Sequence, residues 1–474
     1  MGAFALLTVA AVLLIGVGFA FFLRLERNND QHVAVLLLVV LLFVTQLLHP
    51  NESDTVLGLF RIPAGPIDLR PTDLIVTGAI AAKLLVARPP ARISRSALLW
   101  IAFTVWYGVA AVLGFLNGAE TSEVIFQGRL VISGIGVLVV VSSCDIGKLI
   151  AKDRISRMGR VVGLATAALV VTHLSQLSYT LDAPIVGFSD LGALGGDVRT
   201  MLPFFGVAAL LHEVSSGQRR LTVLLPSVVM IGSPFVSSTA GPYLSLFAGA
   251  SVALVVATGR TWSRRTNLTA SDVVFAVLGL VGVAALSLFL SGGSSPVFVE
   301  QFEDAVLSDS QDTTTGERVQ LWDEATERIV ASPIWGEGLG AKGTIVRPWP
   351  LRAAVATFHN VGFDLAVRSG LVGLALFGLA MGSTLFDARK VWLLHPDNVA
   401  ATLALASMLA IVGLMSRAMV SSAFERSRFT VALFLAVGLV FALRREYEAG
   451  LVADQMKRTI ETDTRPRLPV GELL

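Results

Sequence analysis

The 474-residue sequence has few charged residues and a single cysteine. Asp, Glu, Lys and Arg make up 15% of the chain, against about 25% in soluble domains, whereas 54% of the chain is hydrophobic. A water-soluble enzyme of this length needs more polar surface, so that class is excluded. The lone Cys144 excludes an intrachain disulfide and a cluster of thiolate metal ligands. The formal net charge of +2 gives no bulk attraction to nucleic acid, and we expect no nucleic-acid partner.

Long apolar segments are what the chain has in abundance. About thirteen runs of roughly 16–22 residues approach the ~20 residues that a helix needs to cross a bilayer. No basic stretch precedes the first run, so we do not expect a cleavable signal peptide. The runs at 221–236 and 240–258 form either two helices or one bent helix. The sequence therefore predicts an all-α polytopic bundle of about 12–13 transmembrane helices. The spans lie near 3–23, 32–49, 72–88, 97–116, 124–144, 160–179, 199–215, 221–236, 240–258, 272–291, 366–386, 400–417 and 428–443.

The basic residues indicate which loops are cytoplasmic. Arginine and lysine gather after the odd-numbered spans, for example at 145–159 and 259–265, as the positive-inside rule requires. The intervening loops are neutral or acidic, and the largest, at 292–360, holds ten acidic and five basic residues. We predict an outside amino terminus, an inside carboxyl terminus and one large extracytoplasmic loop with amphipathic helices. The predicted parts are helices 1–10 at 1–291, the loop at 292–365, helices 11–13 at 366–443 and a cytoplasmic tail at 444–474.

Few ionisable residues lie deep in the predicted spans. Lys83 is one turn from the cytoplasmic end of its helix and can extend to that surface. His173 stands alone on an apolar face, as a hydrogen-bonded core histidine or as a proton relay. Because no chain of intramembrane carboxylates is present in the sequence, a proton-coupled pump is disfavoured.

A helix is predicted inside the large loop. Thr314-Thr315-Gly316-Glu317 matches a capping box, which marks a helix start. Helical spacing then places one apolar stripe beside Arg318. The helix either lies on the bilayer with Arg318 as an interface anchor or presents Arg318 to a ligand. The predicted stripe contains Val319, Trp322, Ala325 and Ile329.

A glycine-rich stretch, Ser332-Pro333-Ile334-Trp335-Gly336-Glu337-Gly338-Leu339-Gly340, follows this helix. Proline stops a helix, and glycines at alternate positions favour neither helix nor strand. Such a segment allows backbone N–H groups to approach a ligand, as phosphate-binding loops do, and any tight turn has the same composition.

His359-Asn360 directly precedes the next predicted span. His359 is the only histidine of the large loop, and an imidazole that titrates near neutral pH suits a proton acceptor. The alternative is an interfacial histidine at a helix cap. Asn360 either orients His359 or caps the helix.

These pieces occur in one order that resembles the signature of the O-antigen ligase and O-antigen polymerase superfamily. The order is R-x-x-x-W at Arg318–Trp322, s-P-x-x-G-x-G-x-G at Ser332–Gly340, H-N at His359–Asn360 and a glycine-containing span at Gly370–Gly373. The resemblance implies a GT-C-like membrane glycosyltransferase of the bacterial inner membrane, with its active site on the outer face. It implies a donor glycan on undecaprenyl pyrophosphate, a lipid or glycan acceptor in the cell envelope, and neither a metal ion nor a cofactor.

The resemblance also assigns residues. It makes His359 the catalytic histidine and Arg318 the loop arginine. The second arginine belongs at the outer start of a middle span, where Arg199 is the only basic residue of its loop. Two arginines would hold the pyrophosphate. His359 would take the proton of the acceptor hydroxyl, or orient that hydroxyl, in a single inverting displacement. The predicted substrate-binding residues are Trp322, Gly336, Gly338, Gly340 and Asn360.

Two positions depart from the superfamily pattern. The turn at Ser237–Gly241 lacks an arginine that many relatives carry, and Arg368 stands where a glutamate is common. Both departures concern how the acceptor is recognised more than how the pyrophosphate of the donor is bound. The alternatives to a ligase are a polymerase of lipid-linked repeat units, a transporter or flippase, and a non-catalytic scaffold.

Overall fold

The computed structural model describes helices, two β-ribbons and several connections. The described residues are 19–28, 30, 32–35, 37–38, 62–64, 67–69, 71–86, 94–150, 201, 203–207, 227, 230–231, 248–249, 314–346, 352–355, 357–419 and 427–463. Strand β1 (Ile62–Ala64) pairs antiparallel with β2 (Ile67–Leu69), and β3 (Gly343–Val346) pairs likewise with β4 (Arg352–Val355). The helices include α3 (Pro71–Val86), α4 (Arg95–Leu116), α5 (Thr121–Ser142), α6 (Ile146–Ile150), α14 (Thr314–Ala331), α15 (Val361–Leu394), α16 (Asn398–Ala418) and α17 (Ser427–Asp463).

Four of the described helices, α4, α5, α15 and α16, are long and apolar enough to cross a membrane. They correspond to the spans predicted at 97–116, 124–144, 366–386 and 400–417. The predicted all-α polytopic membrane fold is therefore confirmed. Helix α15 extends beyond its predicted span at both ends. The spans predicted at 160–179, which contains His173, and at 272–291 lie outside the described residues.

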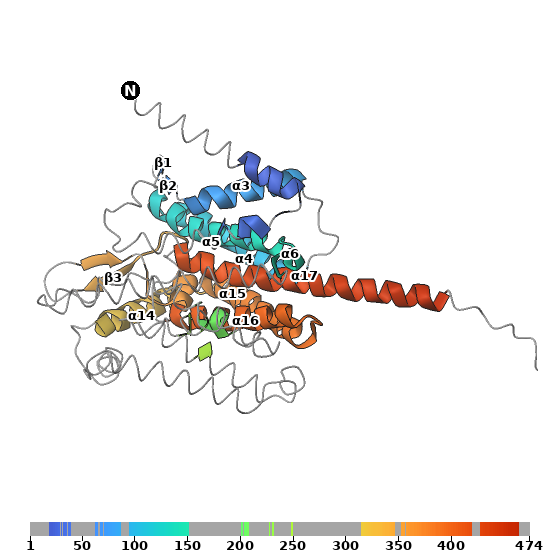
Figure 1. Ribbon diagram of the computed structural model, residues 1–474. Helices are drawn as coiled ribbons and strands as arrows, with labels where there is room; N and C mark the ends of the chain where they lie inside the picture. Colours follow the sequence, from blue (N-terminus) through green and yellow to red (C-terminus); the bar gives the residue numbers. More distant parts are fainter. Residues whose placement is uncertain are drawn as a thin grey trace, which may run out of the picture.

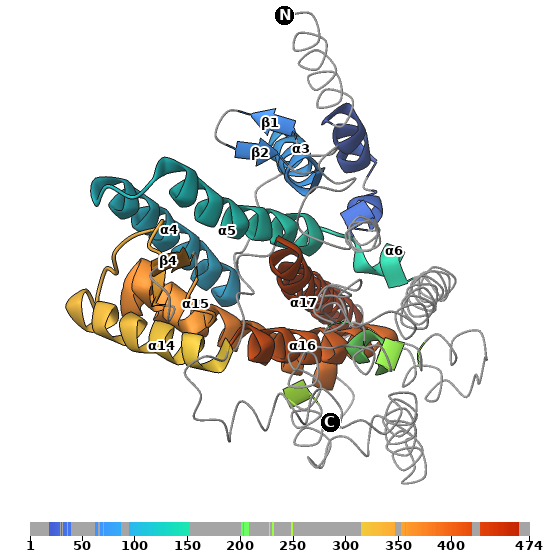
Figure 2. The ribbon, with the colours of Figure 1, turned by 90° about the vertical axis from the view of Figure 1, so that its left-hand side faces the viewer.

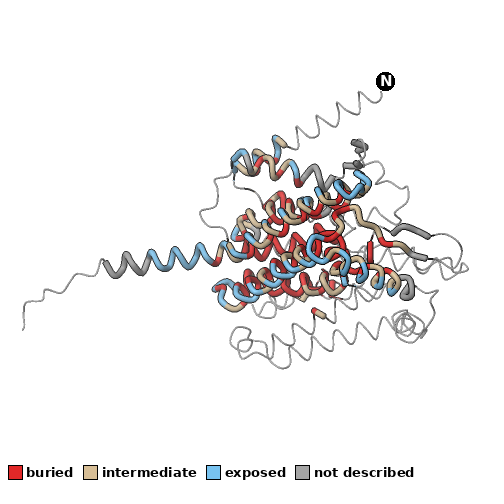
Figure 3. Tube along the Cα trace, turned by 180° about the vertical axis from the view of Figure 1, so that it is seen from behind, coloured by how far each residue is buried: buried red, intermediate tan, exposed pale blue. Residues whose placement is uncertain are grey.

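The centre of the bundle is an aromatic cluster between α4, α15 and α17. The indole of Trp100 meets the rings of Phe103, Phe377 and Phe434 edge-on, with ring centroids 5.0 to 5.9 Å apart. This edge-to-face geometry is favoured between aromatic rings. The indole Nε1 donates to Thr384 Oγ1 at 3.1 Å, which satisfies a buried polar group. Figure 3 shows how buried residues run through the middle of the bundle.

Two glycines allow α17 to lie close against α5 (Figure 2). A Cβ added to Gly438 would lie 2.7 Å from the Cβ of Val141. A Cβ added to Gly134 would collide with the ring of Phe434. Small residues at such contacts permit the close backbone approach on which helix association in membranes depends.

The two ends of the bundle differ. The α4–α5 turn, α14, the β3–β4 ribbon and the start of α15 lie at one end, and the last part of α17 projects from the other (Figure 1). At the projecting end the Arg444 guanidinium pairs with the buried carboxylate of Asp387 on α15. Arg445 donates there to the carbonyl oxygens of Ser143 and Cys144, at 3.2 and 2.7 Å. The first end holds the described signature residues and is the extracytoplasmic end in the predicted topology.

Candidate active site

Helix α14 packs against α15 through a face centred on Leu321 and Ala325 (Figure 2). Both side chains are fully buried, in a small apolar cluster with Phe358 and Val367. Of the predicted apolar stripe, Ala325 is buried in this contact, and Trp322 and Ile329 pack against the same cluster. Val319, in the first part of α14, is 47% exposed.

Trp322 joins the first signature motif to the third. Its indole Nε1 donates to the carbonyl oxygen of Phe358 at 3.0 Å, and its ring lies against Phe363 with centroids 6.0 Å apart. Phe358 immediately precedes His359 in the chain. Arg318 lies four residues before Trp322, so both project from one side of α14 about one turn, or ~5 Å, apart. The structure thus brings the R-x-x-x-W helix and the H-N segment together.

Arg318 is a partly buried cation with unused hydrogen-bonding capacity. Its Nε is buried and has no hydrogen-bond partner among the residues that the structure describes. Burial lowers the pKa of the Arg318 guanidinium from its ordinary value. An arginine keeps its charge even so, because its ordinary pKa lies far above neutral. A positive charge in this state can accept an anionic ligand through a guanidinium fork.

Arg328, two to three turns further along α14, is in the opposite situation. Its Nε donates to Glu337 Oε1 at 2.8 Å, and its second terminal nitrogen also contacts that carboxylate. Its NH1 donates to Glu324 Oε1 at 3.2 Å and to the Lys342 carbonyl oxygen. Although burial acts to lower it, these carboxylates raise the pKa of Arg328 above its ordinary value. Arg328 therefore has a structural role, since it fixes the glycine-rich segment to α14.

We expect Arg328→Ala to lower the free energy of unfolding by about 1–3 kcal/mol, the usual cost of losing hydrogen bonds to charged groups. The loss leaves Glu337 and Glu324 without their shared counter-ion. Thermal unfolding of the detergent-purified protein measures the change, with Arg389→Ala, at an exposed position, as control. An unfolding midpoint equal to that of wild type would contradict this structural role.

The glycine-rich segment connects three helices through its backbone. Five consecutive N–H groups donate to protein acceptors over distances of 2.7 to 3.1 Å. A phosphate-binding loop instead directs successive N–H groups at its ligand. Substrate binding by Gly336, Gly338 and Gly340 stays a prediction, and in this geometry it would act through the shape of the turn. The pairs are Gly336 with the carbonyl of Ser332, Glu337 with Val367, Gly338 with Arg368, Leu339 with Ala110, and Gly340 with Gln127 Oε1.

Glycine is required where this turn meets α4 and α15. Gly338 has φ +96°, and a Cβ there would collide with the backbone of Gly114 on α4. Gly370 has φ +68° and interrupts the helical geometry of α15, where a Cβ would collide with the carbonyl group of Ile334. Left-handed backbone is disfavoured for residues other than glycine, so these positions accept no side chain without strain.

Asn360 caps helix α15. Its side-chain oxygen accepts hydrogen bonds from the backbone N–H groups of Gly362 and Phe363, at 2.8 and 3.3 Å. These are two of the N–H groups that a helix start leaves without an intrahelical partner. Of the two roles left open for Asn360, the structure shows the cap.

His359 lies just before this cap in an unusual backbone conformation. Its φ is +54°, the only positive value at a non-glycine position among the described residues. Its N–H donates to Thr357 Oγ1 at 3.1 Å. The Thr357 hydroxyl donates in turn to Asp364 Oδ2 at 2.8 Å, and the Phe358 N–H donates to Asp364 Oδ1 at 2.9 Å. The turn that carries His359 is therefore held by a carboxylate on the first turn of α15.

Arg368 lies one turn further along α15. Its NH2 is 3.4 Å from Asp364 Oδ1, and both side chains are buried. Arg368 also hydrogen-bonds Tyr107 of α4. The arginine at the position of the superfamily's common glutamate thus lies in a buried network that links α4 to the His359 turn.

The sequence did not indicate Thr357, Asp364, Arg328 or Glu337 as site residues. The Glu324–Arg328 spacing of four residues suggests a helical ion pair, and Asp364 in the first turn of a helix suits an N-terminal carboxylate. Neither signal identifies the partners further along the chain, which follow from how the turns fold back.

Some predicted site features cannot be placed. Arg199 and the turn at Ser237–Gly241 lie outside the described residues. Within the described part of the chain, no group of three or more His, Cys, Asp or Glu side chains is arranged to hold a metal ion. Metal independence and the second arginine both stay predictions.

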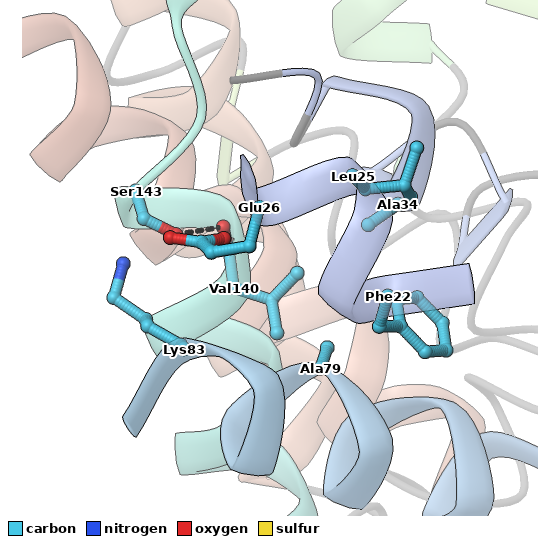
Figure 4. A pocket seen from close by; sticks show the side chains of 8 residues that line it. All are labelled: Phe22, Leu25, Glu26, Ala34, Ala79, Lys83, Val140 and Ser143. Carbon is cyan, nitrogen blue, oxygen red and sulfur yellow. Dashed lines mark hydrogen bonds between the residues drawn. The ribbon is translucent and has the colours of Figure 1, made fainter. Parts of the chain in front are cut away.

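A small pocket lies near the C-terminal end of α5, whereas Gln127, which contacts the glycine-rich segment, lies near the start of that helix (Figure 4). The Lys83 amine points into it near Glu26 and Ser143. Val140, which also lines it, is thirteen residues beyond Gln127 on α5, or ~20 Å along the helix. The pocket is therefore separate from the Arg318–His359 region. It is lined by Phe22, Leu25, Glu26, Ala34, Ala79, Lys83, Val140 and Ser143.

A comparison with protein families supports the motif resemblance. Residues 225–378 match the family model described as O-antigen ligase. The match includes α14, the glycine-rich segment, the His359 turn and the first half of α15. No curated protein sequence matches the chain.

Proposed function

We propose that this multi-pass membrane protein is an inverting, metal-independent glycosyltransferase of the O-antigen ligase and polymerase superfamily. The match of residues 225–378 to the O-antigen ligase family model supports this proposal. Its donor is a glycan on undecaprenyl pyrophosphate, and its acceptor is a lipid or glycan of the cell envelope. The reaction takes place at the outer face of the bacterial inner membrane. There the extracytoplasmic loop, predicted at 292–365, meets the bundle.

The state of Arg318 is the observation that carries this proposal. The guanidinium is partly buried, its Nε has no partner among the described residues, and it lies one turn from the Trp322 that contacts the His359 segment. A pyrophosphate is a good leaving group once its charge is countered, and arginine forks match phosphate oxygens in pairs. Arg318 contacts the pyrophosphate, and Arg199 supplies the second fork, so that two arginines replace a metal ion.

His359 acts as the proton acceptor. The acceptor hydroxyl oxygen forms a bond to the anomeric carbon while the bond from that carbon to the pyrophosphate oxygen breaks. The hydroxyl proton passes to the His359 imidazole, and the electron pair of the broken bond leaves with undecaprenyl pyrophosphate. A single displacement of this kind inverts the anomeric centre. Trp322 connects the R-x-x-x-W helix to the H-N segment, and in this proposal its ring lines the part of the site that binds the donor glycan.

Ligase and polymerase share this chemistry and differ in the acceptor. We favour the ligase. Purified protein in liposomes is given a lipid-pyrophosphate-linked glycan, alone or with candidate envelope glycolipids, and the products are separated by mass. A ligase forms a product only when a glycolipid acceptor is present, whereas a polymerase extends the lipid-linked glycan without one. Donor that crosses the bilayer with its glycan still attached would contradict both and favour a flippase.

The proposed chemistry predicts that a chelator has no effect. Transfer in excess EDTA should stay within about twofold of the untreated rate, because the guanidinium charges do not depend on a bound ion. The initial rate of product formation measures this, and added Mg²⁺ or Ca²⁺ is the control. Loss of transfer in EDTA, restored by one divalent cation, would overturn the metal-free mechanism.

A further inference from the structure

We propose that Thr357 and Asp364 are positioning residues that hold His359 in the conformation in which it accepts the acceptor proton. The inference rests on the proposed function, since it concerns the same histidine. It names two residues that neither the motif pattern nor the family match assigns.

The hydrogen bonds around the His359 turn have a defined direction. A threonine hydroxyl has one proton, and that of Thr357 goes to Asp364 Oδ2 at 2.8 Å. Its lone pair is then available to accept the His359 N–H at 3.1 Å. The other carboxylate oxygen accepts the Phe358 N–H at 2.9 Å. Asp364 thus fixes two successive backbone N–H groups of the turn, one directly and one through Thr357.

These hydrogen bonds stabilise the backbone of His359 in a conformation that is otherwise unfavourable. His359 has φ +54°, in the left-handed region that non-glycine residues disfavour. Such a conformation persists where the surroundings over-determine it, and it is often found at functional sites. The Asn360 cap fixes the chain directly after His359, and the Thr357–Asp364 pair fixes it directly before. The direction of the imidazole therefore depends on both attachments.

Arg368 keeps Asp364 suited to this role. Its NH2 lies 3.4 Å from Asp364 Oδ1, and each side chain is almost fully buried. A buried carboxylate with a cation beside it stays a strong acceptor for two hydrogen bonds. Arg368 also hydrogen-bonds Tyr107 of α4, so Arg368 connects the His359 turn to the helix bundle through Asp364. The arginine that departs from the superfamily pattern is here the counter-ion of the carboxylate that positions His359.

Thr357→Val tests the inference, because it removes the hydroxyl and leaves the Asp364–Arg368 pair in place. We expect its kcat to fall about tenfold with the KM for the donor within twofold of wild type, the sign of an interaction that matters in the transition state. Thr357→Ser keeps the hydroxyl and should recover most of kcat. The matched control is Thr326→Val, an exposed position whose hydroxyl bonds only to its own helix.

The outcomes separate this inference from the proposed function. Failure of wild type to transfer, or full activity in His359→Ala, would overturn the proposed function itself. An active wild type and an inactive His359→Ala, together with unchanged kcat in Thr357→Val, would overturn only the positioning role. A donor KM that rises with the fall in kcat, or equal loss in Thr357→Ser, would overturn it too. If Thr357→Val does not purify as a single species, Thr357→Cys is judged by the same criteria, because a thiol is a weak hydrogen-bond partner.

Discussion

Replacement of Arg318 by alanine is expected to reduce glycan transfer by on the order of 100–1,000-fold, as the loss of one preorganised charge-stabilising group does in other active sites. The physical reason is that Arg318 is partly buried and has an unpaired Nε among the described residues. Its charge is then available to the departing pyrophosphate, and near lipid it is poorly screened. The initial rate of transfer by purified variants measures the effect.

The controls for Arg318 separate charge from geometry and from folding. Arg318→Lys keeps the charge and loses the planar fork, so we expect it to recover less than a tenth of the activity. Arg389→Ala removes an exposed arginine at the opposite end of α15 and should transfer at the wild-type rate. Because Arg318 has no ion pair within the described structure, Arg318→Ala should unfold at the wild-type temperature. Wild-type activity in Arg318→Ala would remove the basis of the proposed mechanism.

Replacement of His359 by alanine is expected to lower kcat about 100–10,000-fold, the range that general acid–base groups contribute. The donor KM should change little, because the imidazole acts on the acceptor hydroxyl and not on the pyrophosphate. Steady-state rates at varied donor and at varied acceptor concentrations separate the two constants.

His359→Gln distinguishes proton acceptance from hydrogen bonding. A glutamine side chain can orient a hydroxyl and cannot take its proton at neutral pH. If His359 is the base, the glutamine variant is as inactive as the alanine variant. A glutamine variant with near wild-type kcat would show that His359 only orients the acceptor and would contradict proton transfer to it.

The transmembrane helices could be predicted because each is a long local run of apolar residues. Helices α4, α5, α15 and α16 coincide with predicted spans, and the segment 292–365 contains α14 and the β3–β4 ribbon. The residues at which these helices begin and end were less predictable. Helix α15 begins at Val361, because Asn360 caps it, and the apolar pattern alone indicates a later start.

For the candidate site, the sequence predicts those structural features that depend on neighbouring residues in the chain. The spacing of Arg318 and Trp322 on one helix, and the capping alternative for Asn360, follow from short-range rules. The partners of the glycine-rich segment were not predictable. Leu339 donates to Ala110 and Gly340 to Gln127, more than two hundred residues away in the chain. No periodicity encodes such pairs, in which N–H groups of the glycine-rich segment bond to acceptors on α4 and α5.

The role of Arg368, which stands where the superfamily commonly has a glutamate, could not be predicted from neighbouring residues either. From the sequence, a basic residue in place of a glutamate concerns recognition of the acceptor more than binding of the pyrophosphate. In the structure its guanidinium pairs with Asp364 and bonds Tyr107, inside the bundle. The charge at this position is therefore understood only with its neighbours from α4 and from its own preceding turn.

The most direct test of the central claim is the stoichiometry of products from the purified protein in liposomes. The measurement follows undecaprenyl pyrophosphate release and glycan attached to the acceptor in the same samples, by mass spectrometry, for wild type and His359→Ala. We predict one lipid pyrophosphate released for each glycan transferred by wild type, with an inverted anomeric linkage in the product, and neither product from the variant. Recovery of the donor with its glycan still attached, in the presence of every acceptor offered, would contradict a glycosyltransferase.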